Sequence, residues 1–197
     1  MPCQDGPSLN AHFVPRTVVL VEGVSDQLAI ETLARRRGRD LESEGISVVP
    51  MGGAGNVGLF LDRYGPSGLD VRLAGLCDAA EEDQFRPGLE RAGLGSNLTS
   101  DDMERLGFYV CVADLEDELI RSLGAAGVEG ILDSQGELGS FRTFQRQPSW
   151  RGRAIADQLR RFIGTFSGRK IRVAPLLVDA LDLTRVPRPL ERLLAHL

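Results

Sequence analysis

Short apolar runs alternate with helical patterns over the first 120 residues of the chain. The run Thr17–Val21 is rich in valine, which is typical of a strand buried on both faces. Leu28, Ile30, Leu33 and Ala34 then recur at the spacing of one helix face. The pattern predicts strands at about 17–22, 46–51, 70–77 and 107–112, with helices over 25–37, 56–64 and 81–91 between them. Repeated strand–helix–strand units imply an α/β fold whose four-stranded sheet is mostly parallel and flanked by helices.

Local signals refine the ends of the shorter helices. Pro87 is expected to distort or divide the third helix. Ser100 is expected to cap a short helix over 101–106, and Asp114 a helix over 115–123.

The strand signal disappears from residue 125 onward. Helical patterns follow at 126–135, 154–163, 172–181 and 187–196, separated by joints that contain glycine and proline. We therefore expect an N-terminal tail (1–16), an α/β core (17–124) and a helical extension packed on that core (125–197).

Composition excludes several classes of protein. No apolar stretch approaches the roughly 20 residues that span a bilayer, and the first 15 residues do not resemble a signal peptide, so a cytoplasmic protein is expected. Cys77 and Cys111 lie inside apolar runs, which favours reduced core thiols. His12 and His196 are the only histidines and no CxxC motif is present, which argues against zinc and against a histidine-based triad.

Charge is distributed unevenly along a chain whose net charge is -5. Residues 76–118 contain 12 acids and 3 arginines, whereas residues 142–172 contain 9 basic residues and one acid. This asymmetry suits a site that holds cations beside a surface that binds a polyanion, although two ordinary solvated faces give the same pattern. Lys170 is the only lysine among 23 basic residues, which suggests a position that needs a compact ammonium.

Three groups of carboxylates stand at or just beyond predicted strand ends. They are Glu22 with Asp26, Asp78 with Glu81 and Glu82 soon after it, and Glu116 with Glu118. The carboxyl ends of neighbouring parallel strands lie about 4.8 Å apart, so these acids can converge. Oxygen ligands without histidine or cysteine favour Mg²⁺ or Mn²⁺.

A competing pattern lies between the first two groups. Gly53, Gly55 and Gly58 match GxGxxG, and Asp78 follows 20 residues after Gly58, which is the spacing of a dinucleotide-binding fingerprint. The motif falls in the second strand–helix unit, and a dinucleotide site leaves Glu22, Glu116 and Lys170 unused. A plainer interpretation is a tight turn whose backbone amides face a phosphate or support the acids.

The segment Val19–Asp26 (VLVEGVSD) resembles the first motif of the TOPRIM fold, and Leu76–Asp78 fits the aspartate motif that follows the third strand. Among TOPRIM proteins the chain is most similar to the nuclease domain of the OLD (overcoming lysogenization defect) family. The features shared with that branch are Asp26 four residues after Glu22, the segment 114–118 (DLEDE), Lys170, and the Gly52–Gly53 turn. The resemblance covers residues 17 to 180.

Two features depart from the family. Many TOPRIM proteins carry Asp-x-Asp after the third strand, but Ala80 occupies the second position here, so Glu81, Glu82 or the later glutamates would have to complete the set. OLD proteins also contain an ABC-type ATPase, and this chain has no GxxxxGK[ST] phosphate loop. We therefore expect a stand-alone relative or one whose ATPase is a separate chain.

The resulting hypothesis is a metal-dependent DNA endonuclease or nickase that uses a two-metal mechanism. Glu22 and Asp78 would hold one Mg²⁺ or Mn²⁺, and Asp26, Glu116 and Glu118 a second, with Lys170 neutralising charge on the scissile phosphate. The expected DNA-contacting residues are Arg142, Arg146, Arg151, Arg153, Arg160, Arg161 and Arg169. Trp150 could stack on a base, although hydrophobic packing is the favoured role for a single tryptophan. The alternatives are a non-catalytic metal- or nucleic-acid-binding module that regulates an ATPase, and a dinucleotide-binding enzyme.

Overall fold

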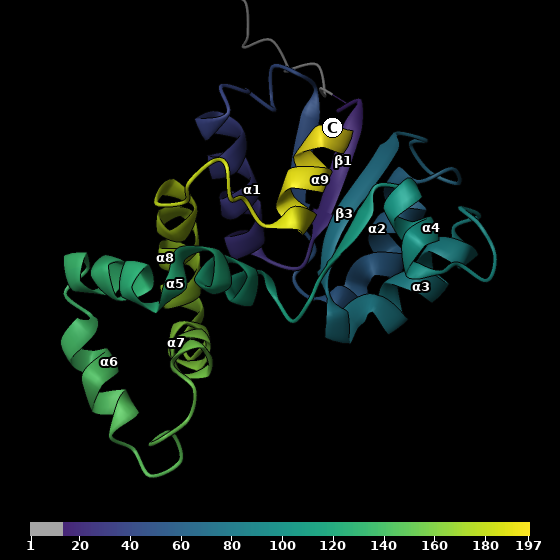
Figure 1. Cartoon of the computed structure of the whole chain (residues 1–197). Helices are drawn as coiled ribbons and strands as arrows, with labels where there is room; N and C mark the ends of the chain where they lie inside the picture. Colours follow the sequence, from purple (N-terminus) through teal and green to yellow (C-terminus); the bar gives the residue numbers. More distant parts are fainter. Residues whose placement is uncertain (1–13) are drawn as a thin grey trace, which may run out of the picture.

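A four-stranded parallel sheet forms the centre of the molecule, as Figure 1 shows. The computed structural model describes residues 14–197, with no description of the Ser167 side chain. The strands lie in the order β2-β1-β3-β4. Their bounds are Thr17–Val21 (β1), Ile46–Pro50 (β2), Arg72–Asp78 (β3) and Phe108–Cys111 (β4). The predicted α/β class and parallel sheet are thus confirmed.

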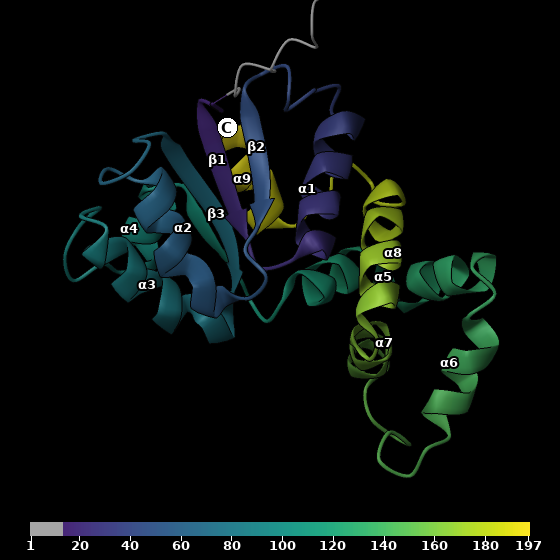
Figure 2. The same ribbon diagram turned by 180° about the vertical axis from the view of Figure 1, so that it is seen from behind.

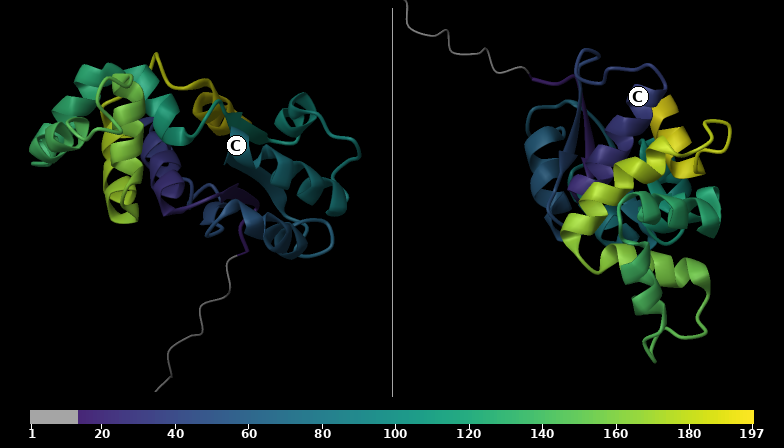
Figure 3. Two further views of the ribbon diagram at one scale, coloured as in Figure 1. Left: turned by 90° about the horizontal axis from the view of Figure 1, so that it is seen from below. Right: turned by 90° about the vertical axis from the view of Figure 1, so that its left-hand side faces the viewer.

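Helices flank the sheet and continue into a helical lobe beside it, which spans residues 115–179. The helices that follow the first three strands are α1 (Val24–Arg36), α2 (Val57–Tyr64) and α3 (Glu82–Arg91), with short turns at Ala54–Asn56 and Ala79–Glu81. The later helices are α4 (Ser100–Arg105), α5 (Leu115–Ser134), α6 (Leu138–Gln145), α7 (Ile155–Gly164), α8 (Ser167–Asp179) and α9 (Arg188–His196). Seen from behind and from below, α5 to α8 stand beside the sheet, away from α3 and α4 (Figures 2 and 3). None of the helices within residues 14–197 combines the length and the apolar character needed to cross a membrane.

Two apolar clusters cover the two faces of the sheet. Because side chains alternate along a strand, Val19 and Val21 pack with α1, α5, α7, α8 and α9, whereas Val18 and Leu20 pack with α2, α3 and α4. The helices of the lobe therefore share one core with the sheet instead of forming a core of their own.

Several local expectations need correction. Thr99, not Ser100, caps α4, because its hydroxyl accepts from the Asp102 amide at 3.2 Å while Asp102 accepts from the Thr99 amide at 3.0 Å. Helix α3 continues through Pro87, which removes one hydrogen-bond donor without dividing the helix. Strand β3 begins at Arg72 because Asp70 adopts a left-handed turn conformation with φ of +48°.

The helical lobe also differs in detail from the prediction. Gly124, with φ of +72°, bends α5 between the two helices that the sequence predicts at 115–123 and 126–135. Helix α6 was not expected, and α8 begins five residues earlier than the predicted 172.

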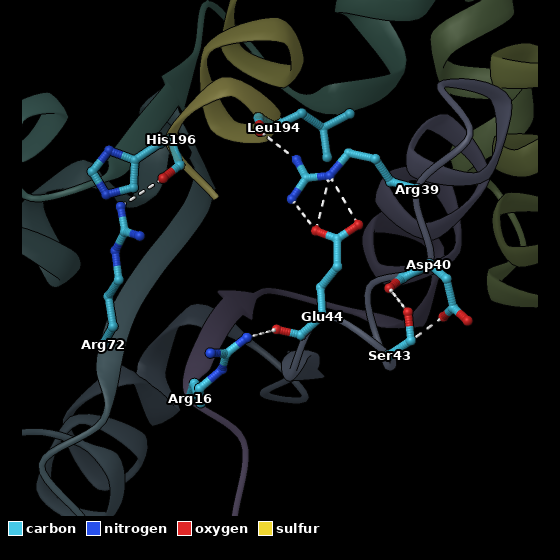
Figure 4. A network of polar contacts seen from close by, with 8 residues as sticks. All are labelled: Arg16, Arg39, Asp40, Ser43, Glu44, Arg72, Leu194 and His196. Atoms are coloured by element: carbon cyan, nitrogen blue, oxygen red, sulfur yellow. Dashed lines mark hydrogen bonds and ion pairs between the residues drawn. The ribbon is translucent and has the colours of Figure 1, made fainter.

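A polar network fastens α9 to the amino end of the sheet, opposite the strand ends that carry the acids (Figure 4). Arg39 donates to the Leu194 carbonyl at 2.6 Å and also binds the carboxylate of Glu44. Arg72, the first residue of β3, donates to the His196 carbonyl at 2.6 Å. These contacts place the last helix of the chain on the sheet rather than in the lobe.

Candidate active site

The carboxyl ends of three adjacent strands meet at one edge of the sheet. Glu22 follows β1, Asp78 ends β3, and Asp114 lies three residues beyond the end of β4. Strand β3 lies between β1 and β4, and Asp78 pairs in register with Cys111. The topology therefore gathers acids that are far apart in the sequence, including Glu22 and Asp78, whose strand ends were expected to meet.

Glu22, Asp78 and Glu81 form a tight cluster of half-buried carboxylates. Each offers one oxygen, and these three oxygens lie within 4.8 Å of one another. Burial, followed by the charges of Asp114 and Glu81, raises the pKa of Asp78 from 3.8 to about 8. Burial and the charge of Glu22 raise the pKa of Glu81 from 4.5 to about 7. Burial and neighbouring negative charge thus dominate at both carboxylates, although the charge of Lys170 acts to lower the pKa of Asp78.

The glycine turn after β2 supports this cluster through the backbone. The amides of Gly52 and Gly53 donate to the carbonyl of Glu22 at 3.0 and 3.1 Å. These donors are therefore used inside the protein and do not point toward a bound phosphate. The finding favours the support role over the dinucleotide fingerprint, since Asp78 also lies among carboxylates rather than beside an open ribose site.

A second, more deeply buried group lies beside the first. Asp26 is 6% exposed, and its carboxylate caps α1 by accepting from the Gly23 amide at 2.9 Å. Glu116 is 3% exposed, and its Oε2 lies 3.1 Å from the ammonium of Lys170. Its other oxygen, Oε1, is buried and has no hydrogen-bond partner among residues 14–197. A buried carboxylate oxygen without a partner is costly, so a water molecule, a proton or a bound cation is needed to satisfy it.

The charges of this second group are strongly coupled. Burial raises the pKa of Glu116 to about 7, although the charge of Lys170 opposes the rise. Burial also acts to lower the pKa of Lys170, but the negative charges of Glu116 and Asp26 outweigh it, so the pKa is raised. Lys170 is therefore a permanent cation at the edge of the acid cluster.

Glu81 and Asp114 are site residues that the sequence hypothesis did not assign. Glu81 lies in the turn after β3, one residue beyond Ala80, and brings its carboxylate back toward Glu22. Asp114 was predicted only as a helix cap; its Oδ1 does accept from the Asp117 amide at 2.8 Å, but its Oδ2 binds Arg160 at 2.6 Å. The signal for Glu81 was its spacing of three residues from Asp78 in a strand-to-helix turn.

Each carboxylate oxygen of Glu118 contacts another group of the protein. Its Oε1 accepts from the Val112 amide at 2.9 Å, and its Oε2 pairs with Arg121 at 2.9 Å. Both oxygens thus have a protein partner, which favours a supporting role for Glu118 over the metal role expected of it. The side chain instead holds the turn between β4 and α5 that carries Asp114.

The seven arginines expected to contact DNA fall into two sets. Arg169 is half-buried: its guanidinium lies 3.9 Å from the centroid of the Phe162 ring and pairs with Glu137, so it is not a free surface cation. Arg142 pairs with Glu129 at 2.7 Å, and Arg160 with Asp114. The remaining four pair with no acidic side chain in the part of the chain that the structure describes; they are Arg146, Arg151, Arg153 and Arg161.

Residues 13–79 match the family model of the overcoming lysogenization defect protein-like TOPRIM domain. The chain contains an OLD-like TOPRIM domain. The match spans β1 to β3 and includes Glu22, Asp26 and Asp78. No curated protein matches the chain.

Two solved structures extend the OLD-like similarity over nearly the whole fold. The C-terminal region of the Xanthomonas campestris pv. campestris OLD protein is 23% identical, with a TM-score of 0.72 over 93% of this chain and 92% of that one. The C-terminal region of the Burkholderia pseudomallei OLD protein is 20% identical, with a TM-score of 0.71 over 92% of this chain and 96% of that one. The helical lobe is therefore part of a shared fold with the TOPRIM sheet.

Proposed function

We propose that this OLD-like TOPRIM chain is a metal-dependent nuclease that hydrolyses phosphodiester bonds in DNA. The observation that carries the proposal is the convergence of Glu22, Asp78 and Glu81, whose oxygens lie within 4.8 Å of one another. The acids come from the turns after two adjacent strands, a position where α/β proteins build their sites.

The donor set fits a hard divalent cation. Three carboxylates at this separation repel one another, and a bound Mg²⁺ or Mn²⁺ relieves the repulsion with the oxygen ligands that these ions prefer. Glu22, Asp78 and Glu81 would hold the first ion. Asp26 and the unpartnered Oε1 of Glu116 would contribute to a second. When bound, such ions supply Lewis acidity that activates water and polarises the phosphoryl group.

Glu81 compensates for Ala80 in this proposal. TOPRIM proteins that carry Asp-x-Asp place two carboxylates after the third strand, and here Asp78 and Glu81 provide two with one residue more between them. The short turn Ala79–Glu81 returns the longer glutamate side chain to the cluster. The departure at Ala80 therefore does not require a loss of activity.

Lys170 would face the charge that develops on the phosphate during hydrolysis. Its side chain is 27% exposed, so the ammonium reaches the surface of the site while Glu116 fixes its position at 3.1 Å. A preorganised cation in a partly buried site stabilises such charge more strongly than one in water does. Exposed arginines of the lobe would bind the DNA backbone without reading its sequence.

A plasmid-nicking assay with Mg²⁺ and Mn²⁺ tests the proposal. We expect the unmodified chain to nick DNA and both Glu22→Gln and Lys170→Ala to lose most of that activity. Glu42→Gln, which changes an exposed glutamate outside the site, is the matched control and should behave as the unmodified chain does. Equal cleavage by all four proteins would defeat the residue assignment, and Mn²⁺ binding without cleavage by any of them would indicate a non-catalytic module.

The resemblance to OLD proteins also leads us to propose that an ATPase on a separate chain works with this domain. Co-purification of such an ATPase with the tagged chain would support this partnership. Full nicking activity of the isolated chain, unchanged when the ATPase and ATP are added, would count against it.

A further inference from the structure

A polar groove runs along helix α7 and reaches Asp114, the acid just beyond the end of β4. One side of α7 carries Asp157, Arg160 and Arg161, which are three and four residues apart and so share a face. The opposite side of the helix carries buried residues such as Leu159 and Phe162. The groove is lined by Asp114, Trp150, Arg153, Asp157, Arg160 and Arg161.

Asp114 joins this groove to the candidate metal site. It lines the groove, and it lies three residues beyond Cys111, which pairs in register with Asp78 at the end of β3. The ion pair between Asp114 and Arg160, at 2.6 Å, marks the point where the groove meets the acids. A strand held at the acids would therefore continue into the groove over Arg160 and Arg161.

Trp150 and Arg153 line the groove and form a layered platform, with the guanidinium over the ring. The Trp150 ring stacks on Phe144 with ring centroids 5.1 Å apart and an interplanar angle of 29°. The guanidinium of Arg153 lies over the Trp150 ring, 5.1 Å from its centroid, and its Nε donates to the Ser149 carbonyl at 2.8 Å. Phe144 and Arg153 thus both lie against the Trp150 ring, and because Arg153 is exposed, the outer face of its guanidinium is the surface left for a stacking base.

The buried side-chain amide of Gln158 holds the turn that carries Trp150. Gln158 is 6% exposed; its Nε2 donates to the Trp150 carbonyl at 2.8 Å, and its Oε1 accepts from Gln145 at 2.7 Å. Both ends of the amide are thus satisfied, and both bonds hold the segment between α6 and α7. A platform held in this way loses little conformational freedom when a ligand stacks on it.

We propose that this groove binds an unpaired stretch of the DNA strand next to the cleavage position, with a base stacked on the guanidinium of Arg153, which in turn lies over Trp150. The inference rests on the proposed nuclease function and names its substrate class. The phosphates of the strand would lie over Arg160 and Arg161, whose charge is complementary to theirs. Asp157 repels phosphate, and its carboxylate instead suits the amino group of a base.

Base stacking inside a duplex explains why the bound stretch must be unpaired. Aromatic rings and guanidinium planes stack on the face of a base, and this face is covered by neighbouring bases inside a duplex. A single strand, a flap or a frayed end leaves the face open. The groove thus predicts tighter binding of a single strand than of a duplex of the same length.

The intrinsic fluorescence of the chain reports on this contact directly, because Trp150 is its only tryptophan. The unmodified protein would be titrated in EDTA with an oligothymidine of about 12 nucleotides and with a duplex of the same length. We expect the single strand to quench the fluorescence of Trp150 and the duplex to have little effect. Binding of the single strand without any change in fluorescence would overturn the inference, as would failure of the single strand to bind.

Variants test the same contact through the anisotropy of a labelled oligothymidine. Trp150→Leu and Arg153→Ala should each weaken single-strand binding, the former roughly tenfold. Phe166→Leu is the control, because Phe166 is also an exposed aromatic residue but lines a different hollow. Equal affinity of all these proteins would contradict the proposal.

The outcomes separate this inference from the proposed function. Plasmid nicking without quenching by a single strand would overturn the groove assignment alone. Quenching by a single strand in a protein that does not nick DNA under any metal condition would overturn the nuclease assignment alone.

Discussion

The ion pair between Lys170 and Glu116 engages only one of the two carboxylate oxygens of Glu116. The ammonium lies 3.1 Å from Oε2, whereas Oε1 is buried without a hydrogen-bond partner among residues 14–197. The pair joins the first turn of α8 to the first turn of α5 at the edge of the acid cluster. It thus combines a structural role with a position suited to phosphate chemistry, and the two roles are separable by experiment.

A double-mutant cycle separates the two roles of Lys170. Lys170→Ala leaves the Glu116 carboxylate buried without its cation and should lower the free energy of unfolding by about 2 to 4 kcal/mol. Adding Glu116→Gln removes the uncompensated charge and should restore part of that stability. Urea unfolding measures the stabilities, and plasmid nicking should remain lost in the double variant. A double variant that nicks DNA would show that Lys170 acts only through Glu116.

Asp78→Asn should stabilise the metal-free chain while abolishing metal binding. The pKa of Asp78 is raised from 3.8 to about 8 by folding, so the unfolded chain releases this proton at lower pH than the folded chain does. Stability of the metal-free protein should therefore fall as the pH rises from about 4 to about 8. Asp78→Asn lacks this pH-dependent loss of stability. Near pH 8, its free energy of unfolding should therefore exceed that of the unmodified chain by at least about 1 kcal/mol. Unfolding in EDTA across this range checks the sign, and identical pH profiles would contradict it.

Variants of Glu118 test whether its side chain supports the turn after β4 or binds a metal ion. Glu118→Gln keeps an oxygen that can accept from the Val112 amide, so it should fold normally and retain the shift in melting temperature caused by Mn²⁺. Glu118→Ala leaves that amide without its partner and should lower the free energy of unfolding by about 1 to 3 kcal/mol. Loss of the Mn²⁺ shift in Glu118→Gln alone would identify Glu118 as a metal ligand after all.

Arg161 and Arg169 should differ in what their removal affects. Arg161 is exposed in the groove, so Arg161→Ala should weaken DNA binding and reduce the salt dependence of log K by about one unit. Arg169 is half-buried and held by Glu137 and Phe162, so Arg169→Ala should destabilise the fold instead. Binding titrations over a range of salt concentrations, together with thermal unfolding, distinguish the two effects. The account fails here if Arg169→Ala folds normally and loses affinity as Arg161→Ala does.

The strands and the first acids were predictable from sequence because their signals are local. A valine-rich run buries itself wherever it lies, and an acid directly after such a run must lie at a strand end, as Glu22 and Asp78 do. Their proximity also followed, since parallel strands bring their carboxyl ends to one edge. The unusual single lysine was a compositional signal, and Lys170 does lie beside Glu116.

The missed features depend on partners that are distant in the sequence. Asp114 looks like an ordinary helix cap until Arg160, 46 residues later, binds its second oxygen. Arg169 looks like a surface cation until Glu137, 32 residues earlier, pairs with it in the lobe. Glu118 lies in the predicted segment, but only the fold shows that the Val112 amide takes its oxygen. Charge type is readable from sequence, whereas the partner that uses each charge is set by packing.

Diffraction from a crystal soaked in Mn²⁺ tests the central claim most directly, because anomalous scattering locates the ions without reference to activity. The account predicts a peak at coordination distance from the carboxylates of Glu22, Asp78 and Glu81, and a second peak beside Oε1 of Glu116 at higher Mn²⁺ concentration. A protein that cleaves DNA but shows no Mn²⁺ peak at these three carboxylates would contradict it.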